Sequence, residues 1–126
     1  MEEPLLYHGT NRSFYEEYVD EDGKYRSEVY LSINLVRSLG YAYQRARQFN
    51  ASPLLIIVKS SLVKERLEKQ MIEGEYRLYG LEKKEHIPLE IPQPLIPIGI
   101  LEMRQLCVKI KNAVKAKFGI YPEMPY

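Results

Sequence analysis

The sequence predicts a single α+β domain over residues 1–126. Short runs rich in β-branched and aromatic residues alternate with longer stretches in which apolar residues recur at helical spacing. Apolar residues make up 45% of the chain and charged residues 28%, which is enough to bury a core and still face water. A chain of 126 residues has room for one core. No linker, internal repeat or low-complexity tract divides it.

The elements follow from local patterns taken in order. We expect strands at residues 4–8, 28–32, 53–59, 85–91 and 95–101, the last two joined by a proline-stiffened turn because proline lacks the amide donor of a sheet ladder. Residues 53–59 are nearly all apolar, which predicts a strand buried on both faces. We expect a helical turn at residues 14–19 and helices at 35–49, 60–71 and 102–118. Residues 75–81 are ambiguous, with a strand as one interpretation.

Composition excludes several classes of protein. The formal net charge of +1 gives no global bias toward nucleic acid phosphates. The one cysteine, Cys107, cannot form an intrachain disulfide, and we expect it to be buried. The residues show no spacing typical of a metal site, so we expect no metal. The longest apolar run is far shorter than a membrane span, and the N-terminus has no signal-peptide pattern. We therefore expect a soluble, cytoplasmic protein with no membrane partner.

The first candidate site element is Tyr7-His8-Gly9-Thr10, where a predicted strand delivers a histidine directly before a glycine. Without a side chain, Gly9 lets its backbone approach a ligand closely. His8 offers a donor and an acceptor nitrogen to a sugar hydroxyl. Judged alone, a histidine at this point is more often structural than functional.

The second element is Val29-Tyr30-Leu31-Ser32. Tyr30 can present its ring to a flat heterocycle, although a strand tyrosine is more often part of the core. The hydroxyl of Ser32 can contact a ligand or cap the helix that follows, a role that Asn34 could also fill.

The third element is an acid on the proline-flanked strand. Alternation places Glu85 on the same face as Ile87 and Leu89, whereas Glu90 lies on the opposite face, toward solvent. A carboxylate at the mouth of a core-facing strand needs a partner or a function, because unpaired buried charge is costly. The alternative is that Glu85 ends a solvated charged turn.

These elements resemble the ADP-ribosyltransferase superfamily, in the branch with a His–Tyr–Glu triad that includes the diphtheria-toxin-like enzymes and the poly(ADP-ribose) polymerases. The likeness rests on His8-Gly9-Thr10, on Tyr30-Leu31-Ser32 and on the helix with Ala42, Tyr43 and Ala46. It covers residues 4–50 well and residues 85–101 loosely. It implies a split, mixed β-sheet of about five to seven strands with about three flanking helices.

The resemblance also implies roles. The substrate would be NAD, and the reaction would cleave its nicotinamide–ribose bond and transfer ADP-ribose to a protein or nucleic-acid acceptor. His8 would bond a ribose hydroxyl, the backbone of Gly9 would pair with the nicotinamide carboxamide, and Tyr30 would stack on the nicotinamide ring. Thr10 and Ser32 would add polar contacts. Glu85, or failing that Glu90, would be the catalytic glutamate and would bond the 2′-hydroxyl of the nicotinamide ribose.

Two alternatives remain open at this point. One is an RNA 2′-phosphotransferase-like enzyme, for which Arg12, Arg37 and Arg45 are the nearby basic candidates. The other is a non-catalytic module in which the cleft binds a nucleotide or the basic helix at residues 103–118 docks a partner.

Overall fold

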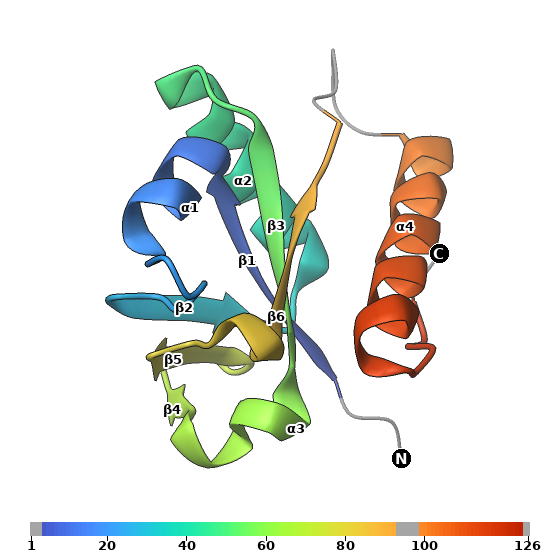
Figure 1. Cartoon of the computed structure of the whole chain (residues 1–126). Helices are drawn as coiled ribbons and strands as arrows, with labels where there is room; N and C mark the ends of the chain where they lie inside the picture. Colours follow the sequence, from blue (N-terminus) through green and yellow to red (C-terminus); the bar gives the residue numbers. More distant parts are fainter. Residues whose placement is uncertain (1–3, 93–98, 125–126) are drawn as a thin grey trace.

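Six strands form one sheet in a computed structural model that describes residues 4–92 and 99–124. The order across the sheet is β4–β5–β2–β1–β3–β6 (Figure 1). The strands are β1 (Leu5–Asn11), β2 (Glu28–Ser32), β3 (Pro53–Lys59), β4 (Glu68–Lys69), β5 (Glu75–Tyr79) and β6 (His86–Glu90). The helices are α1 (Arg12–Tyr18), α2 (Leu35–Phe49), α3 (Ser60–Val63) and α4 (Ile100–Phe118), with 3₁₀ turns η1 (Lys64–Arg66) and η2 (Lys83–Glu85). The chain is thus α+β, as predicted.

All five strand pairings among the described residues are antiparallel. The expectation of a mixed sheet is therefore wrong. The reason is the position of β1, which lies between β2 and β3 and is antiparallel to both. The helix α2 connects β2 to β3, two strands that run the same way, but β1 keeps them from pairing.

The sheet opens between β1 and β2. Tyr7 and Ser32 form the one register pair described between these strands, whereas seven pairs join β1 to β3 and five join β2 to β5. Figure 1 shows β2 and β5 running across the direction of β1, β3 and β6. The backbone edges of β1 and β2 are therefore left apart over most of their length, and this opening is where the candidate site lies.

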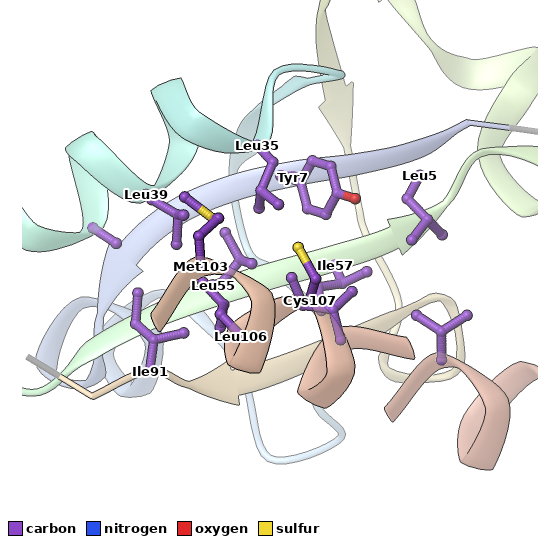
Figure 2. Close-up of a cluster of buried hydrophobic side chains, with 13 residues drawn as sticks. Leu5, Tyr7, Leu35, Leu39, Leu55, Ile57, Ile91, Met103, Leu106 and Cys107 are labelled. Carbon is purple, nitrogen blue, oxygen red and sulfur yellow. The ribbon is translucent and has the colours of Figure 1, made fainter. Parts of the chain in front are cut away.

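One face of the sheet packs against α2 and α4. Leu39 of α2 and Met103, Leu106 and Cys107 of α4 converge on strand residues such as Leu55 (Figure 2). The burial of Cys107 confirms its prediction. This core fixes α2 against β1, which matters because α2 forms one wall of the site.

The other face carries a second core beneath α1 and α3. It joins Leu6, Leu31, Ile56, Leu78 and the neighbouring apolar side chains. Because Leu55 and Ile57 point to the first core while Ile56 and Val58 point to the second, β3 is buried on both faces, as predicted.

The expected helix at residues 60–71 is wrong. Only α3 and η1 form, no side chain caps α3, and the chain then pairs with β5 as β4. The apolar content of this segment is small, and tertiary contacts decide its structure: the guanidinium of Arg66 binds the carbonyls of Tyr79 and Gly80.

Other boundaries shift less. The first strand extends past residue 8 to Asn11, and Asn34 rather than Ser32 caps α2. Residues 75–79 form a strand, which resolves the ambiguity there. The strand expected at 85–91 is β6, whereas most of the one expected at 95–101 lies outside the described residues; Ile100 and Leu101 belong to α4.

Candidate functional site

Two cavities meet at the opening between β1 and β2. One, of about 470 Å³, lies on the α2 side and includes Ser38 and Tyr41 in its lining. The other, of about 340 Å³, lies on the α1 side and is lined in part by Phe14 and Tyr18. Both volumes fall in the range of small-molecule sites. His8, Tyr30 and Arg45 line both cavities, so these three side chains stand at the junction of the two lobes.

His8 bridges the opening between the strands. Its Nδ1 lies 2.8 Å from the carbonyl oxygen of Tyr30, and because a carbonyl only accepts, Nδ1 carries the proton. The other ring nitrogen, Nε2, is left with a lone pair that can accept a hydroxyl proton. Burial, aided by the positive charge of Arg45, lowers the pKa of His8 to about 4. The imidazole is therefore neutral at pH 7.

Gly9 is required by packing as well as by any ligand. A Cβ at this position would lie 1.9 Å from the backbone oxygen of Ser38 and 2.6 Å from the amide nitrogen of Ala42. The missing side chain therefore lets α2 lie directly on β1, a packing role that the sequence did not indicate. The amide of Arg12 donates to the carbonyl of Ser52, the residue before β3. Because hydrogen-bonded and non-hydrogen-bonded pairs alternate along antiparallel strands, the N–H and C=O of Gly9 point away from β3 and toward β2.

The other predicted binding residues surround the same opening. Tyr30 is 52% exposed, which argues against the core interpretation, and its hydroxyl lies 3.3 Å from Glu28 Oε1. Ser32 is buried, and its Oγ accepts from the amide of Asn34 at 3.0 Å. Thr10 is buried and lines the 340 Å³ cavity. The structure thus brings His8, Gly9, Thr10, Tyr30 and Ser32 together.

The acid in the larger cavity is Glu75, which the sequence reasoning did not select. It is the first residue of β5 and pairs in register with Ser32 of β2, which in turn pairs with Tyr7 of β1. Glu75 therefore lies level with Tyr7, the residue before His8. Glu75 lines the 470 Å³ cavity with His8 and Tyr30. Arg37 Nη1 donates to its Oε1 at 3.0 Å and fixes the carboxylate from the side of α2.

Two signals could have pointed to this lining. The strand interpretation of residues 75–81 would have placed Glu75 at a strand start, as the motif requires, but its pairing with β2 is not visible in the sequence. On α2, the polar side chains Ser38, Tyr41 and Arg45 recur at helical spacing beside the apolar stripe, and all three line the 470 Å³ cavity.

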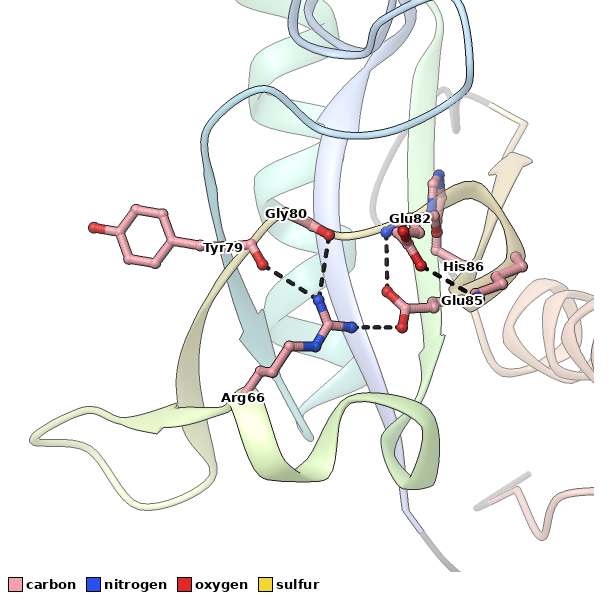
Figure 3. Close-up of polar contacts among 7 residues, drawn as sticks. Arg66, Tyr79, Gly80, Glu82, Glu85 and His86 are labelled. Carbon is pink, nitrogen blue, oxygen red and sulfur yellow. Dashed lines mark hydrogen bonds and ion pairs between the residues drawn. The ribbon is translucent and has the colours of Figure 1, made fainter.

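Glu85 lies elsewhere and has a structural environment. It is buried at the end of η2, where its Oε1 accepts from the amide of Glu82 at 2.9 Å and its Oε2 pairs with Arg66 (Figure 3). Figure 3 also shows Arg66 reaching the carbonyls of Tyr79 and Gly80. The carboxylate therefore joins η1, η2 and the end of β5. It is not a solvated turn residue, and it does not line either cavity of the opening.

Glu90 is also outside the opening. It ends β6, pairs in register with Leu54 of β3, and accepts hydrogen bonds from Nε and Nη2 of Arg12. Both side chains of this ion pair are about half exposed, at 46% for Arg12 and 56% for Glu90. The structure therefore brings neither glutamate predicted as the acid to His8 and Tyr30.

The charges around the opening are distributed unevenly. Arg12 and Arg37 are each paired with a carboxylate. Arg45, by contrast, has no carboxylate within 4.0 Å in the described part of the chain. Its guanidinium donates to the carbonyl of Gly9 and lies 5.4 Å from the centre of the Tyr41 ring. Residues 4–92 and 99–124 contain no group of side chains suited to a metal ion.

Comparison of the chain with models of protein families, with curated proteins and with solved structures finds no match. Across the described ranges, no helix has both the length and the apolar character needed to cross a bilayer.

Proposed function

We propose that this protein is an NAD-dependent ADP-ribosyltransferase in which His8 and Tyr30 bind NAD and Glu75 is the catalytic carboxylate. The observation that carries the proposal is the shared cavity: a neutral histidine, an exposed strand tyrosine and a carboxylate line one 470 Å³ space although they come from three strands. The split of the sheet, which creates that space, supports the resemblance stated from the motifs.

Three groups at the opening suit the nicotinamide half of NAD. The lone pair on His8 Nε2 suits a ribose hydroxyl, because the proton of the ring is held at Nδ1 by the carbonyl of Tyr30. The backbone of Gly9 faces the opening and suits a planar carboxamide. The Tyr30 ring, half exposed in the cavity, suits stacking on nicotinamide. Thr10 and Ser32 lie at the edges of the lobes.

Glu75 supplies the electrostatics of the reaction. When the bond between C1′ of the ribose and nicotinamide breaks, its electron pair leaves with nicotinamide and positive charge builds on the sugar. A carboxylate near the 2′-hydroxyl stabilises that charge. The acceptor then forms a bond to C1′ and loses its proton. Arg37 orients the Glu75 carboxylate, since it donates to one carboxylate oxygen.

The binding half of this proposal is tested by titration with NAD. We expect His8→Ala and Tyr30→Ala to weaken NAD binding by roughly tenfold or more, the effect of losing one good hydrogen bond or stacking contact. The matched control is Tyr79→Ala, because Tyr79 is equally exposed, at 54%, on the neighbouring strand but lines neither cavity of the opening. Equal NAD affinity in all three variants would contradict the proposal.

A measurement of nicotinamide release, made beside the titration, addresses the alternatives. Saturable NAD binding without release of nicotinamide, with protein, DNA and RNA offered as acceptors, would favour the binding module. Turnover that depends on a 2′-phosphorylated RNA would favour the phosphotransferase. Among the three arginines considered for that reaction, Arg12 and Arg37 are paired with carboxylates, and Arg45 lines the opening.

A further inference from the structure

Arg45 lies where the two lobes of the site, the 470 Å³ and 340 Å³ cavities, meet. It rises from α2, lines both cavities, and donates through Nη1 to the carbonyl of Gly9. Its own carbonyl accepts from Asn11 Nδ2 at 3.0 Å, so the backbone at the base of this side chain is held while the guanidinium extends into the opening. The side chain therefore covers a carbonyl that, in the proposed function, pairs with the carboxamide of NAD.

Arg45 has no ion-pair partner among the described residues, and the one acidic residue that lines the 340 Å³ lobe with it, Glu28, pairs with Arg77 instead. No acidic side chain of the described residues approaches its guanidinium within 4.0 Å, whereas Arg12, Arg37, Arg66 and Arg77 all have carboxylate partners. The nearest aromatic contact, with Tyr41, leaves the positive charge intact. A cation in this situation is suited to an anionic ligand, and arginine is suited to phosphate in particular.

A second group in the smaller cavity points to a polar ligand. Tyr25 is only 5% exposed, and its hydroxyl is the one buried side-chain polar atom without a hydrogen-bond partner in the described part of the chain. Tyr25 and Arg45 line the same 340 Å³ lobe. A buried hydroxyl without a partner is costly unless a ligand satisfies it.

We propose that the 340 Å³ lobe is the diphosphate site of the substrate, formed by the Arg45 guanidinium and the Tyr25 hydroxyl, and that Arg45 leaves the Gly9 carbonyl when the substrate enters. The inference deepens the proposed function and rests on it. The carboxamide of the substrate then donates to the Gly9 carbonyl in place of Arg45, and the Arg45 guanidinium donates to the phosphates. Arg45 thereby couples the two lobes and favours a dinucleotide over either half alone.

The experiment measures two ligands separately, ADP-ribose and nicotinamide, by titration against the wild-type protein and two variants. Arg45→Met keeps an unbranched apolar stem in place of the arginine but cannot donate. We expect it to bind ADP-ribose roughly tenfold more weakly, the loss expected for one charge-assisted hydrogen bond, and to bind nicotinamide at least as tightly as the wild type because the competitor at Gly9 is gone. The matched control is Arg47→Met, which removes an exposed arginine of the same helix.

Tyr25→Phe separates binding from folding. It removes only a hydroxyl that lacks a protein partner, so unfolding should occur at the same or a higher denaturant concentration while ADP-ribose binding weakens. Equal losses for both ligands in Arg45→Met would indicate a structural role and overturn the inference, as would unchanged ADP-ribose binding in both variants. A wild-type protein that binds neither ligand would contradict the proposed function itself, and with it this assignment.

Discussion

His8 shows how the surroundings of one residue set its chemistry. Its side chain would be charged in part of the population near neutral pH if it were free in water. Burial and the charge of Arg45 hold its pKa at about 4, and the carbonyl of Tyr30 selects the tautomer with the proton on Nδ1. The result is a neutral ring that presents an acceptor nitrogen to the opening.

The same shift predicts a dependence of stability on pH. Between the ordinary pKa of 6.5 and the folded value of about 4, the unfolded chain binds a proton at His8 and the folded protein does not, so acid favours unfolding in this range. Burial lowers the pKa of His86 in the same sense. We expect the free energy of unfolding to fall by roughly 1–3 kcal/mol from pH 6.5 to 4 on account of His8.

The measurement is denaturant unfolding at several pH values for the wild type and His8→Gln. The variant keeps the contribution of His86 but loses that of His8, so its stability should fall less steeply toward pH 4. Identical pH profiles for the two proteins would show that His8 titrates normally.

Gly9 gives a second prediction at the level of one residue. Gly9→Ala places a methyl group against the backbone of α2 at Ser38, and backbone cannot move aside without shifting the helix. We expect a loss of about 1–3 kcal/mol in the free energy of unfolding. The control is Gly40→Ala in the same helix, where a Cβ meets nothing within 4 Å. There the higher helix propensity of alanine should raise the free energy of unfolding by about 0.5–1 kcal/mol. A Gly9→Ala protein as stable as the wild type would contradict the packing of α2 on β1.

Glu85 acts on three elements at once. Its carboxylate accepts from the start of η2 and pairs with Arg66 of η1, which in turn binds the carbonyls at the end of β5. It is buried, whereas its partner Arg66 is 40% exposed. This carboxylate holds the segment that replaced the helix expected at residues 60–71.

We therefore expect Glu85→Gln to destabilise the protein and to leave nicotinamide release from NAD intact when the folded fraction is accounted for. The expected loss is about 1–3 kcal/mol, because a charged partner of a buried hydrogen-bond network is removed. Glu90→Gln breaks an exposed ion pair with Arg12 and should cost about 0–1 kcal/mol. Chemical denaturation of both variants is the measurement, and equal losses would contradict the structural assignment of Glu85.

At the level of elements, the sequence predicted what local pattern determines. β2, β3, α2 and most of β1, β6 and α4 follow from periodicity and capping residues. The helix predicted at residues 60–71 was wrong because its pattern lacks a substantial apolar stripe. The contacts of Arg66 and the pairing of β4 with β5 outweigh the local helix propensity there. Long-range pairing of this kind has no local signal.

At the level of the whole molecule, the site depends on where the sheet opens. His8, Tyr30 and Ser32 could be selected from the sequence because each stands in a short motif. Glu75 could not, because its place in the site comes from the pairing of β5 with β2, far apart in the chain. Of the two acids that the sequence indicated, Glu90 lies in β6, beyond β3 and on the opposite side of β1 from β2, and Glu85 lies in η2, where it pairs with Arg66.

The most direct test of the account is release of nicotinamide from NAD by the wild-type protein, Glu75→Gln and Glu90→Gln, with candidate acceptors present. Glutamine keeps the size of the side chain but removes the charge that stabilises the developing cation. We expect turnover by the wild type and by Glu90→Gln, and a fall of roughly a hundredfold or more in Glu75→Gln. Turnover that survives in Glu75→Gln, or that is lost in Glu90→Gln instead, would contradict it.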